Sequence, residues 1–205
     1  MAAGAWISHD LLKVSTVDAL KFVNDENLAI QDRFQGEFEL IANAYALEES
    51  CRPVVEEMIL EGGARAIAVS SSYDDGTDRI FLDSPRAEWL WEFAVAYDLV
   101  VHVHRPMLSV GHELLMQYRL NQRLPSDYFK TNILVDTMGF NPIGVRAVVE
   151  LCGVDRVVFG SDFGAIPNGM EEHIKIVEDG LPNPVERELV FWQNSNKIIR
   201  LGMEG

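Results

Sequence analysis

The stretch Leu99-Val-Val-His-Val-His104 is short, almost continuously apolar and rich in β-branched valine. Runs of this kind are typical of strands that are buried on both faces, as in parallel sheets. Because side chains alternate across a strand, His102 and His104 share one face, and Val101 and Val103 point the other way. The stretch therefore predicts a buried parallel strand with one polar face.

Similar short apolar runs occur on both sides of this stretch. We expect further strands at Phe38–Ala44, Ala64–Ser71, Asn132–Thr137 and Arg156–Gly160. Helices are predicted at Leu47–Glu61, Arg86–Tyr97, Pro142–Cys152 and Pro184–Leu201, with Trp192 and Ile198 on the apolar side of the last, and Tyr73–Arg79 is predicted as a polar loop. This alternation of strands and helices predicts an α/β fold of βα units, arranged as a parallel sheet or a barrel.

The composition limits the class of protein and its partners. The chain has 205 residues, of which 48% are hydrophobic, and a formal net charge of −15. This apolar content supports a buried core, and the length suits one domain. A groove that binds nucleic acid needs a basic patch, and with 17 Lys+Arg against 32 Asp+Glu the chain has few basic residues to form one. The negative net charge also repels anionic membranes. We expect one domain that binds neither nucleic acid nor a membrane.

The cysteines and the N-terminus bear on the cellular compartment. Cys51 and Cys152 lie far apart in apolar segments predicted as helical, and we interpret them as buried, reduced thiols. Residues 1–10 lack the basic residue and the long apolar run of a secretory signal. No apolar stretch approaches the ~18 residues of a membrane span. We expect a cytoplasmic protein.

Metal-competent side chains stand at the ends of two predicted strands. His102 and His104 end one strand, and Asp162 directly follows another in Phe159-Gly-Ser-Asp-Phe163. Sites in parallel α/β folds form at the carboxyl ends of strands. Imidazole and carboxylate groups bind divalent metal ions, and Asp162 could also act as a general base. The alternatives are histidines of the core or the surface and a helix N-cap aspartate.

Other side chains give weaker signals. Asp136 ends a predicted strand, so it is a third carboxylate candidate. His112 is either a loop histidine or a further site residue, and Arg105 is either a surface charge or a partner for a substrate carboxylate. His173 is expected on a solvated helix face. Serine hydrolysis at Ser70–Ser72 is rejected because no G-x-S-x-G motif surrounds it.

A series of motifs runs in order along nearly the whole chain. They are Arg33–Gly36, Leu47–Pro53, Gly63–Val69, Leu82–Pro85, Leu99–Pro106, Tyr128–Thr137, Gly153–Asp162 and Asn194–Gly202. This ordered set resembles the amidohydrolase-2 family, the metal-dependent hydrolases and decarboxylases related to aminocarboxymuconate semialdehyde, γ-resorcylate and 5-carboxyvanillate decarboxylases. The resemblance implies a (β/α)8 TIM-type barrel with one divalent metal, usually zinc or manganese, at its carboxyl mouth.

The resemblance also implies roles for individual residues. His104 corresponds to the metal-binding histidine of the family's fifth strand, and Asp162 to the metal-binding and catalytic aspartate of the eighth. His102 would line the same interior. The implied reaction is hydrolysis by metal-activated water, or decarboxylation of a small aromatic or muconate-type acid with Asp162 moving a proton. We expect zinc as the cofactor, with manganese as the alternative.

The chain departs from the family pattern in two places. The family's first strand carries an H-x-H or E-x-H pair of metal ligands, which residues 1–35 lack. The segment between His104 and Thr131 is too short for the family's sixth strand, unless Gly111-His-Glu113 is that strand's histidine motif. We therefore expect an incomplete barrel, about five to six of eight βα units over residues 1–205.

An incomplete barrel leaves sheet edges uncovered, which favours a homo-oligomer. Two functional interpretations stay open. The chain is a metal-dependent hydrolase or decarboxylase of a small carboxylated molecule, or it is an inactive barrel fragment or assembly partner without a complete metal site.

Overall fold

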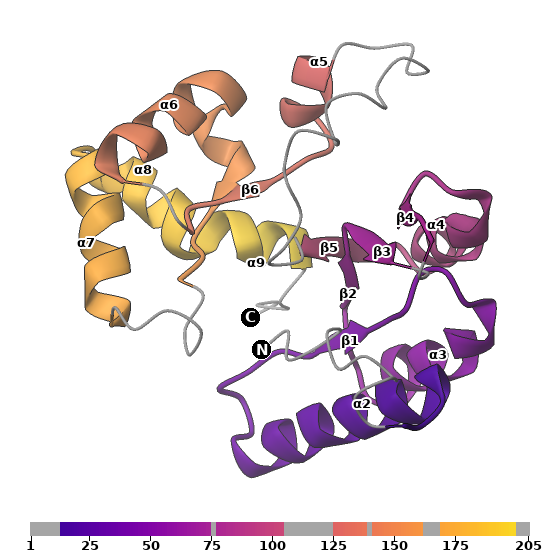
Figure 1. Cartoon of the computed structure of the whole chain (residues 1–205). Helices are drawn as coiled ribbons and strands as arrows, with labels where there is room; N and C mark the ends of the chain where they lie inside the picture. Colours follow the sequence, from indigo (N-terminus) through magenta and orange to yellow (C-terminus); the bar gives the residue numbers. More distant parts are fainter. Residues whose placement is uncertain (1–12, 75–76, 105–124, 139–140, 162–168, 200–205) are drawn as a thin grey trace. The chain divides into compact units, whose positions relative to one another are not determined.

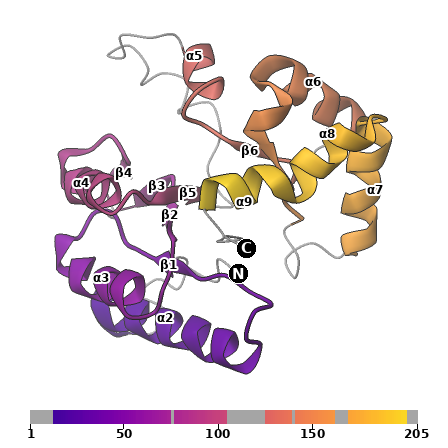
Figure 2. The ribbon, with the colours of Figure 1, turned by 180° about the vertical axis from the view of Figure 1, so that it is seen from behind.

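The structure is a computed structural model and describes residues 13–74, 77–104, 125–138, 141–161 and 169–199 (Figures 1 and 2). The chain divides into two compact units, Met1–Val110 and Gly111–Gly205. In the described ranges, no helix has the length and apolar character needed to cross a bilayer. The single barrel domain over residues 1–205 stays a prediction.

The first unit is built on a parallel sheet with the strand order β1-β2-β5. Its strands are β1 (Ile41–Asn43), β2 (Ala66–Ser70) and β5 (Val100–His104). Asn43 pairs with Ala68, which in turn pairs with His102, and Ser70 pairs with His104. The predicted parallel pairing is confirmed, although β1 and β2 are shorter than the apolar runs that contain them. The prediction that β5 is buried was wrong: the strand is half-buried, and Val103 is 47% exposed.

Helices of this unit pack against one face of the sheet and against its β1 edge. They are α2 (Thr16–Arg33), α3 (Arg52–Leu60) and α4 (Glu88–Ala96), with short 3-10 turns η1 (Glu49–Cys51) and η2 (Pro85–Ala87) before the last two. In both views α2 and α3 lie beside β1 (Figures 1 and 2). Ile67 and Val69 of β2 join Val55 of α3 and Leu90 and Phe93 of α4 in the main buried core. The apolar face of β2 is therefore the face that meets the helices.

Helix α2 was not predicted from the sequence. It begins after the N-cap Ser15, whose hydroxyl accepts a hydrogen bond from the backbone N–H of Asp18 at 3.1 Å. Its buried side holds Leu20 and Val23 together with two asparagines, Asn24 and Asn27. The other buried residue is Ala19. Asparagines on the buried face interrupt the apolar period, so the helical pattern does not show in hydropathy alone.

The segment predicted as the loop Tyr73–Arg79 contains strand structure, which corrects that prediction. The strands β3 (Ser72–Asp74) and β4 (Arg79–Phe81) pair in an antiparallel hairpin. Tyr73 is buried, and its hydroxyl accepts hydrogen bonds from the N–H groups of Ala46 and Ser70, each at 3.2 Å. The buried tyrosine anchors a segment whose polar sequence had suggested a loop.

The second unit contains a short parallel pair, β6 (Val135–Asp136) and β7 (Val157–Val158). Its helices are α5 (Pro125–Phe129), α6 (Pro142–Cys152), α7 (Met170–Gly180), α8 (Pro184–Glu188) and α9 (Asn194–Ile199), with the 3-10 turn η4 (Val154–Arg156) and the π-helical turn η5 (Leu189–Gln193). Val145, Val157, Val177 and Val190 form its buried core. The side of β7 that carries Val157 therefore packs against the helices of this unit, just as one face of the first sheet packs against helices.

Two predictions about helix faces were wrong. His173 is 8% exposed, because it precedes Val177 by four residues and shares the buried side of α7. Trp192 is 46% exposed, because it lies in the π-helical turn η5, which changes the spacing of side chains around the helix. The side chain of Ile198 lies outside the described residues.

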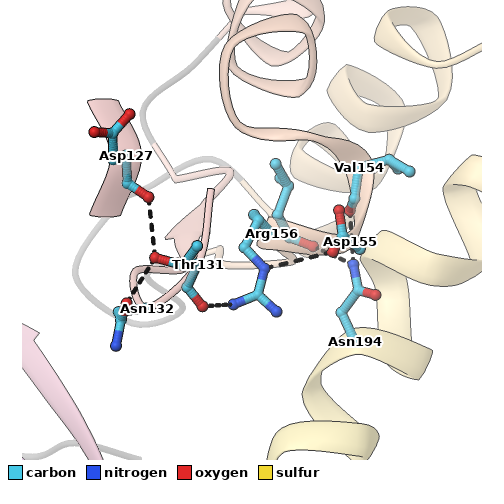
Figure 3. Close-up of polar contacts among 8 residues, drawn as sticks. Asp127, Thr131, Asn132, Val154, Asp155, Arg156 and Asn194 are labelled. Carbon is cyan, nitrogen blue, oxygen red and sulfur yellow. Dashed lines mark hydrogen bonds and ion pairs between the residues drawn. The ribbon is translucent and has the colours of Figure 1, made fainter. Parts of the chain in front are cut away.

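The start of β7 is held by polar contacts from both sides (Figure 3). The Arg156 guanidinium donates from Nη1 to the Thr131 carbonyl at 2.7 Å. The Asn194 amide on α9 donates to the carbonyls of Val154 at 2.8 Å and Val157 at 2.7 Å. These contacts tie β7 to the segment before β6 and to the C-terminal helix.

The two cysteines are buried and free, as predicted. Burial is the main cause that raises the pKa of the Cys51 thiol to about 11, with a further contribution from the Glu48 carboxylate. Burial also raises the pKa of Cys152. Both thiols are therefore kept protonated at neutral pH, which suits residues that pack in the interior.

Candidate active site

The face of the β1-β2-β5 sheet that turns away from α3 and α4 carries polar and small side chains. Residues paired across parallel strands share a face, so Asn43, Ala68 and His102 form one row. Ser70 and His104 form the next row, at the carboxyl end of the strands. We call these five residues the polar face.

The polar face follows directly from alternation along β5. Val101 packs against the main core, so His102 and His104 point to the opposite side. Both histidines are half-buried, and their ring centroids lie 6.0 Å apart with an interplanar angle of 70°. The structure thus brings the two predicted histidines together on one face.

The backbone at the end of β2 continues the sheet beyond the paired strands. The Ser71 N–H donates to the His104 carbonyl at 2.8 Å. The Ser70 hydroxyl donates to the Ser72 carbonyl at 2.8 Å, and the Ser70 N–H donates to the Tyr73 hydroxyl. These bonds fix the backbone of His104 relative to β2, so the histidine sits on a rigid element.

Asn43 ends β1 and brings a buried amide to the polar face. Its backbone N–H donates to Asn24 Oδ1 at 2.9 Å, and its carbonyl accepts from Asn24 Nδ2 at 3.2 Å. The Asn43 side chain donates from Nδ2 to Asn24 Oδ1 at 3.3 Å. In the described part of the chain β1 is an edge strand, and Asn24 supplies the hydrogen bonds that a neighbouring strand would give to the backbone of Asn43.

In the second unit, Asp136 is the last residue of the strand β6, as Asn43 and His104 are the last residues of β1 and β5. It pairs with Val158, so it lies on the side of β7 that faces away from the core residue Val157. Its Oδ1 accepts from the Met138 N–H at 3.0 Å. A Cβ at Gly160 would lie only 3.0 Å from the Asp136 Cβ, so glycine is what allows this close approach.

The remaining predicted site residues, Asp162, His112 and Arg105, lie outside the described residues. In the part of the chain that the structure describes, no group of three or more His, Cys, Asp or Glu side chains is placed to hold a metal ion. His102 and His104 supply imidazoles from one strand end, and imidazole is a ligand for zinc, iron and related divalent ions. The donor chemistry of β5 therefore fits a divalent metal.

Sequence comparison alone gives no relatives for this chain. No family model matches it, and no curated protein matches it. Comparison of the folds does give clear similarities to solved structures, each with a probability of 1.00.

Three of the similar structures are decarboxylases. One is 2,6-dihydroxybenzoate decarboxylase from Rhizobium, with a TM-score of 0.77 and 12% identity over 91% of this chain and 78% of that one. A dihydroxybenzoic acid decarboxylase from Polaromonas sp. JS666, with bound manganese and the inhibitor 2-nitroresorcinol, has a TM-score of 0.78 and 15% identity over 91% and 76%. A third is the 5-carboxyvanillate decarboxylase from Novosphingobium aromaticivorans, complexed with manganese and 4-hydroxy-3-methoxy-5-nitrobenzoic acid. Its TM-score is 0.74, with 15% identity over 98% of this chain and 74% of that one.

At this level of identity the likeness shows the fold. The chain has the α/β fold of these decarboxylases, so the resemblance expected from the ordered motifs is confirmed at the level of the fold. Functional roles for particular residues do not follow from a shared fold and need an argument from the site.

Among the structural roles missed in the sequence, three belong to buried asparagines. Asn43 follows the same alternation of side chains along a strand as His102, so its place on the polar face could have been predicted. Asn24 and Asn194 act through backbone groups distant in sequence. No local pattern reports such contacts.

Proposed function

We propose that this protein is a metal-dependent carboxy-lyase that removes the carboxyl group from a small aromatic acid. The observation that carries the proposal is the polar face, with His102 and His104 at the carboxyl end of a parallel strand. This is the end where parallel α/β folds place their sites. The similar folds support decarboxylation over hydrolysis, since their names specify decarboxylases of dihydroxybenzoate and carboxyvanillate.

The proposed metal ligands are His104 and Asp162, with His102 and Asp136 as candidates to complete the site. Manganese is favoured over the zinc expected from the sequence, because three of the similar structures contain it. A bound divalent ion would act as a Lewis acid that stabilises negative charge on the substrate.

The side chains then have distinct tasks. Decarboxylation breaks the bond between the ring carbon and the carboxyl carbon, releases CO2 and leaves the electron pair on the ring carbon, which takes up a proton. Asp162 is the proposed carrier of that proton. Arg105 is the proposed partner of the substrate carboxylate, because its guanidinium can form two parallel hydrogen bonds, and His112 is a further candidate contact.

The proposal includes the finer points of architecture that the sequence predicted. The sheets of the two units would belong to a TIM-type barrel within one domain. Copies of the chain would associate so that the free edges of the short sheets are covered. The expected setting is the cytoplasm.

The first test is metal content. The full chain, purified without a metal-binding tag, is dialysed against manganese or zinc, and bound metal is measured by elemental analysis. We expect about one metal ion per chain, lost in His104→Ala. The matched control is His173→Gln, which changes a buried histidine on α7 and should keep the metal.

The second test is turnover of 2,6-dihydroxybenzoate and 5-carboxyvanillate, followed by CO2 release. Asp162→Asn should abolish turnover while the circular dichroism spectrum stays that of the wild type. A metal-loaded wild-type chain that releases no CO2 from any aromatic acid would overturn the proposed reaction. The inactive barrel fragment would then be the better interpretation.

A further inference from the structure

The hydroxyl of Tyr73 joins the chain segments at the carboxyl ends of β1 and β2. It accepts hydrogen bonds from the Ala46 N–H, in the segment that leaves β1, and from the Ser70 N–H, in the last residue of β2, each at 3.2 Å. Just before this point the two segments bond directly, from the Ala44 N–H to the Ala68 carbonyl at 3.0 Å. The phenol oxygen therefore continues the connection between the two strands beyond their direct backbone bonds.

The other side of β2 is joined to β5 at the same level. Ser70 pairs with His104, and the next residue, Ser71, donates its N–H to the His104 carbonyl at 2.8 Å. In the part of the chain that the structure describes, β2 is the one strand that pairs with β5. The position of His104 relative to the sheet therefore depends on where the end of β2 is held.

Burial makes the oxygen of Tyr73 hard to replace. Tyr73 is 6% exposed, and the backbone groups that it binds belong to the buried residues Ala46 and Ser70. In both views β3, which carries Tyr73, lies beside β2 (Figures 1 and 2). Without the oxygen, two buried N–H groups would lose their acceptor, and the strand ends would move apart so that water could reach them.

The aromatic ring of Tyr73 has a separate contact. It packs edge-on against Tyr45, with the ring centroids 4.5 Å apart. Phenylalanine at residue 73 would keep this contact and lose the hydroxyl alone. The packing of the ring and the bonds of the oxygen can therefore be separated by one substitution.

We propose that Tyr73 is a positioning residue of the candidate active site, which holds the end of β2 and so sets the place of the His104 imidazole for the metal ion. The inference rests on the proposed function, because it takes His104 as a metal ligand. Loss of the groups that fix a metal ligand weakens metal binding roughly 10- to 100-fold. Because Tyr73 acts on His104 through the backbone of β2, we expect a loss near the lower end of that range.

The first test measures the affinity of the full chain for Mn²⁺ by isothermal titration calorimetry. In Tyr73→Phe the affinity should fall roughly 10-fold. The matched control is Tyr97→Phe, which removes a hydroxyl that donates to Glu56 at 2.6 Å beyond the end of α4 and should keep the wild-type affinity. A second control, Met58→Ala, removes a core side chain of the same unit and lowers its stability. It should also keep the affinity, provided that circular dichroism shows a folded chain, so it separates positioning from a general loss of stability.

The second measurement uses the wild type, so it decides the matter even if Tyr73→Phe does not fold. Coupling between two sites is reciprocal, so metal bound by His104 should in turn stabilise the bonds to Tyr73. When Mn²⁺ is added, amide hydrogen exchange should slow at Ala46 and Ser70 by more than at Ile67. Ile67 lies in the middle part of β2 and reports the stabilisation of the unit as a whole.

Three results would each overturn the inference. They are an Mn²⁺ affinity of Tyr73→Phe within about twofold of the wild type, an equal loss in folded Met58→Ala, and slowing at Ala46 and Ser70 that does not exceed the slowing at Ile67. The outcomes also separate the inference from the proposed function. CO2 release together with an unchanged affinity in Tyr73→Phe refutes the inference alone, whereas Mn²⁺ binding that depends on Tyr73 without CO2 release supports the inference and refutes the proposed reaction. A wild-type chain that binds no Mn²⁺ refutes both.

Discussion

Replacing Asn24 by alanine removes the group that closes the outer edge of β1. Asn24 is 1% exposed and connects α2 to the last residue of that strand. The substitution deletes its hydrogen bonds to the Asn43 N–H at 2.9 Å, to the Asn43 carbonyl at 3.2 Å and to the Asn43 side-chain Nδ2 at 3.3 Å. Alanine favours the helix, so α2 itself should persist. The loss therefore falls on the strand.

The magnitude follows from the groups left without partners. Each buried polar group deprived of its hydrogen bond costs about 1–3 kcal/mol. Three groups of Asn43 are affected, namely the backbone N–H, the carbonyl and the side-chain Nδ2. With some water entering the space of the lost side chain, we expect the free energy of unfolding to fall by about 2–4 kcal/mol. That is a large fraction of the roughly 5–15 kcal/mol typical of a folded domain.

The assay is urea unfolding of the full chain, followed by circular dichroism, with native-state hydrogen exchange of the Asn43 amide as a local probe. The control is Glu26→Ala, an exposed position on the same helix, which should stay within about 0.5 kcal/mol of the wild type. The reasoning fails if Asn24→Ala unfolds like the control, or if the Asn43 amide keeps its wild-type protection.

Three further substitutions or conditions test other parts of the fold. Gly160→Ala should destabilise the second unit by about 1–3 kcal/mol, since the new Cβ would lie 3.0 Å from the Asp136 Cβ; an unfolding midpoint equal to that of the wild type would show that the strands adjust freely. Asn194→Ala should lower the free energy of unfolding by about 1–3 kcal/mol, because the carbonyls of Val154 and Val157 lose their donor. Slower amide hydrogen exchange or an unchanged free energy of unfolding would contradict this. Burial raises the pKa of Cys51 to about 11 and of Tyr73 to about 12, above their ordinary values of 9.0 and 10.0, so the stability from these protonated groups is present below pH 9 and declines as the pH rises toward 12. Urea midpoints measured from pH 8 to 11 should fall, and less steeply in Cys51→Ala; parallel curves would argue against the cysteine contribution.

The parallel strands and most of the helices could be predicted from the sequence because their signals are local. Pro142–Cys152 begins with Pro after an Asn cap and ends before a glycine of positive φ, so helix α6 has the predicted bounds. The strand Val100–His104 was equally clear from its valines. The polar face followed from alternation alone.

The parts that sequence reasoning missed depend on contacts between distant residues. Tyr73 is buried because its hydroxyl accepts hydrogen bonds from two backbone N–H groups. Its neighbours in sequence are polar, so their hydropathy indicates a loop. The buried side of α2 includes asparagines whose partners lie on a later strand. A local pattern gives no information about partners that only the folded chain supplies.

The π-helical turn Leu189–Gln193 limits how the C-terminal helix can change length over evolution. Residues in an α-helix are separated by about 100° around the axis, so one deletion or insertion there would rotate everything that follows by that angle. Asn194, the first residue after the turn, would swing away from the carbonyls it binds, while Val190, before the turn, would stay in the core. Related chains should therefore keep this segment at constant length and accept gaps elsewhere.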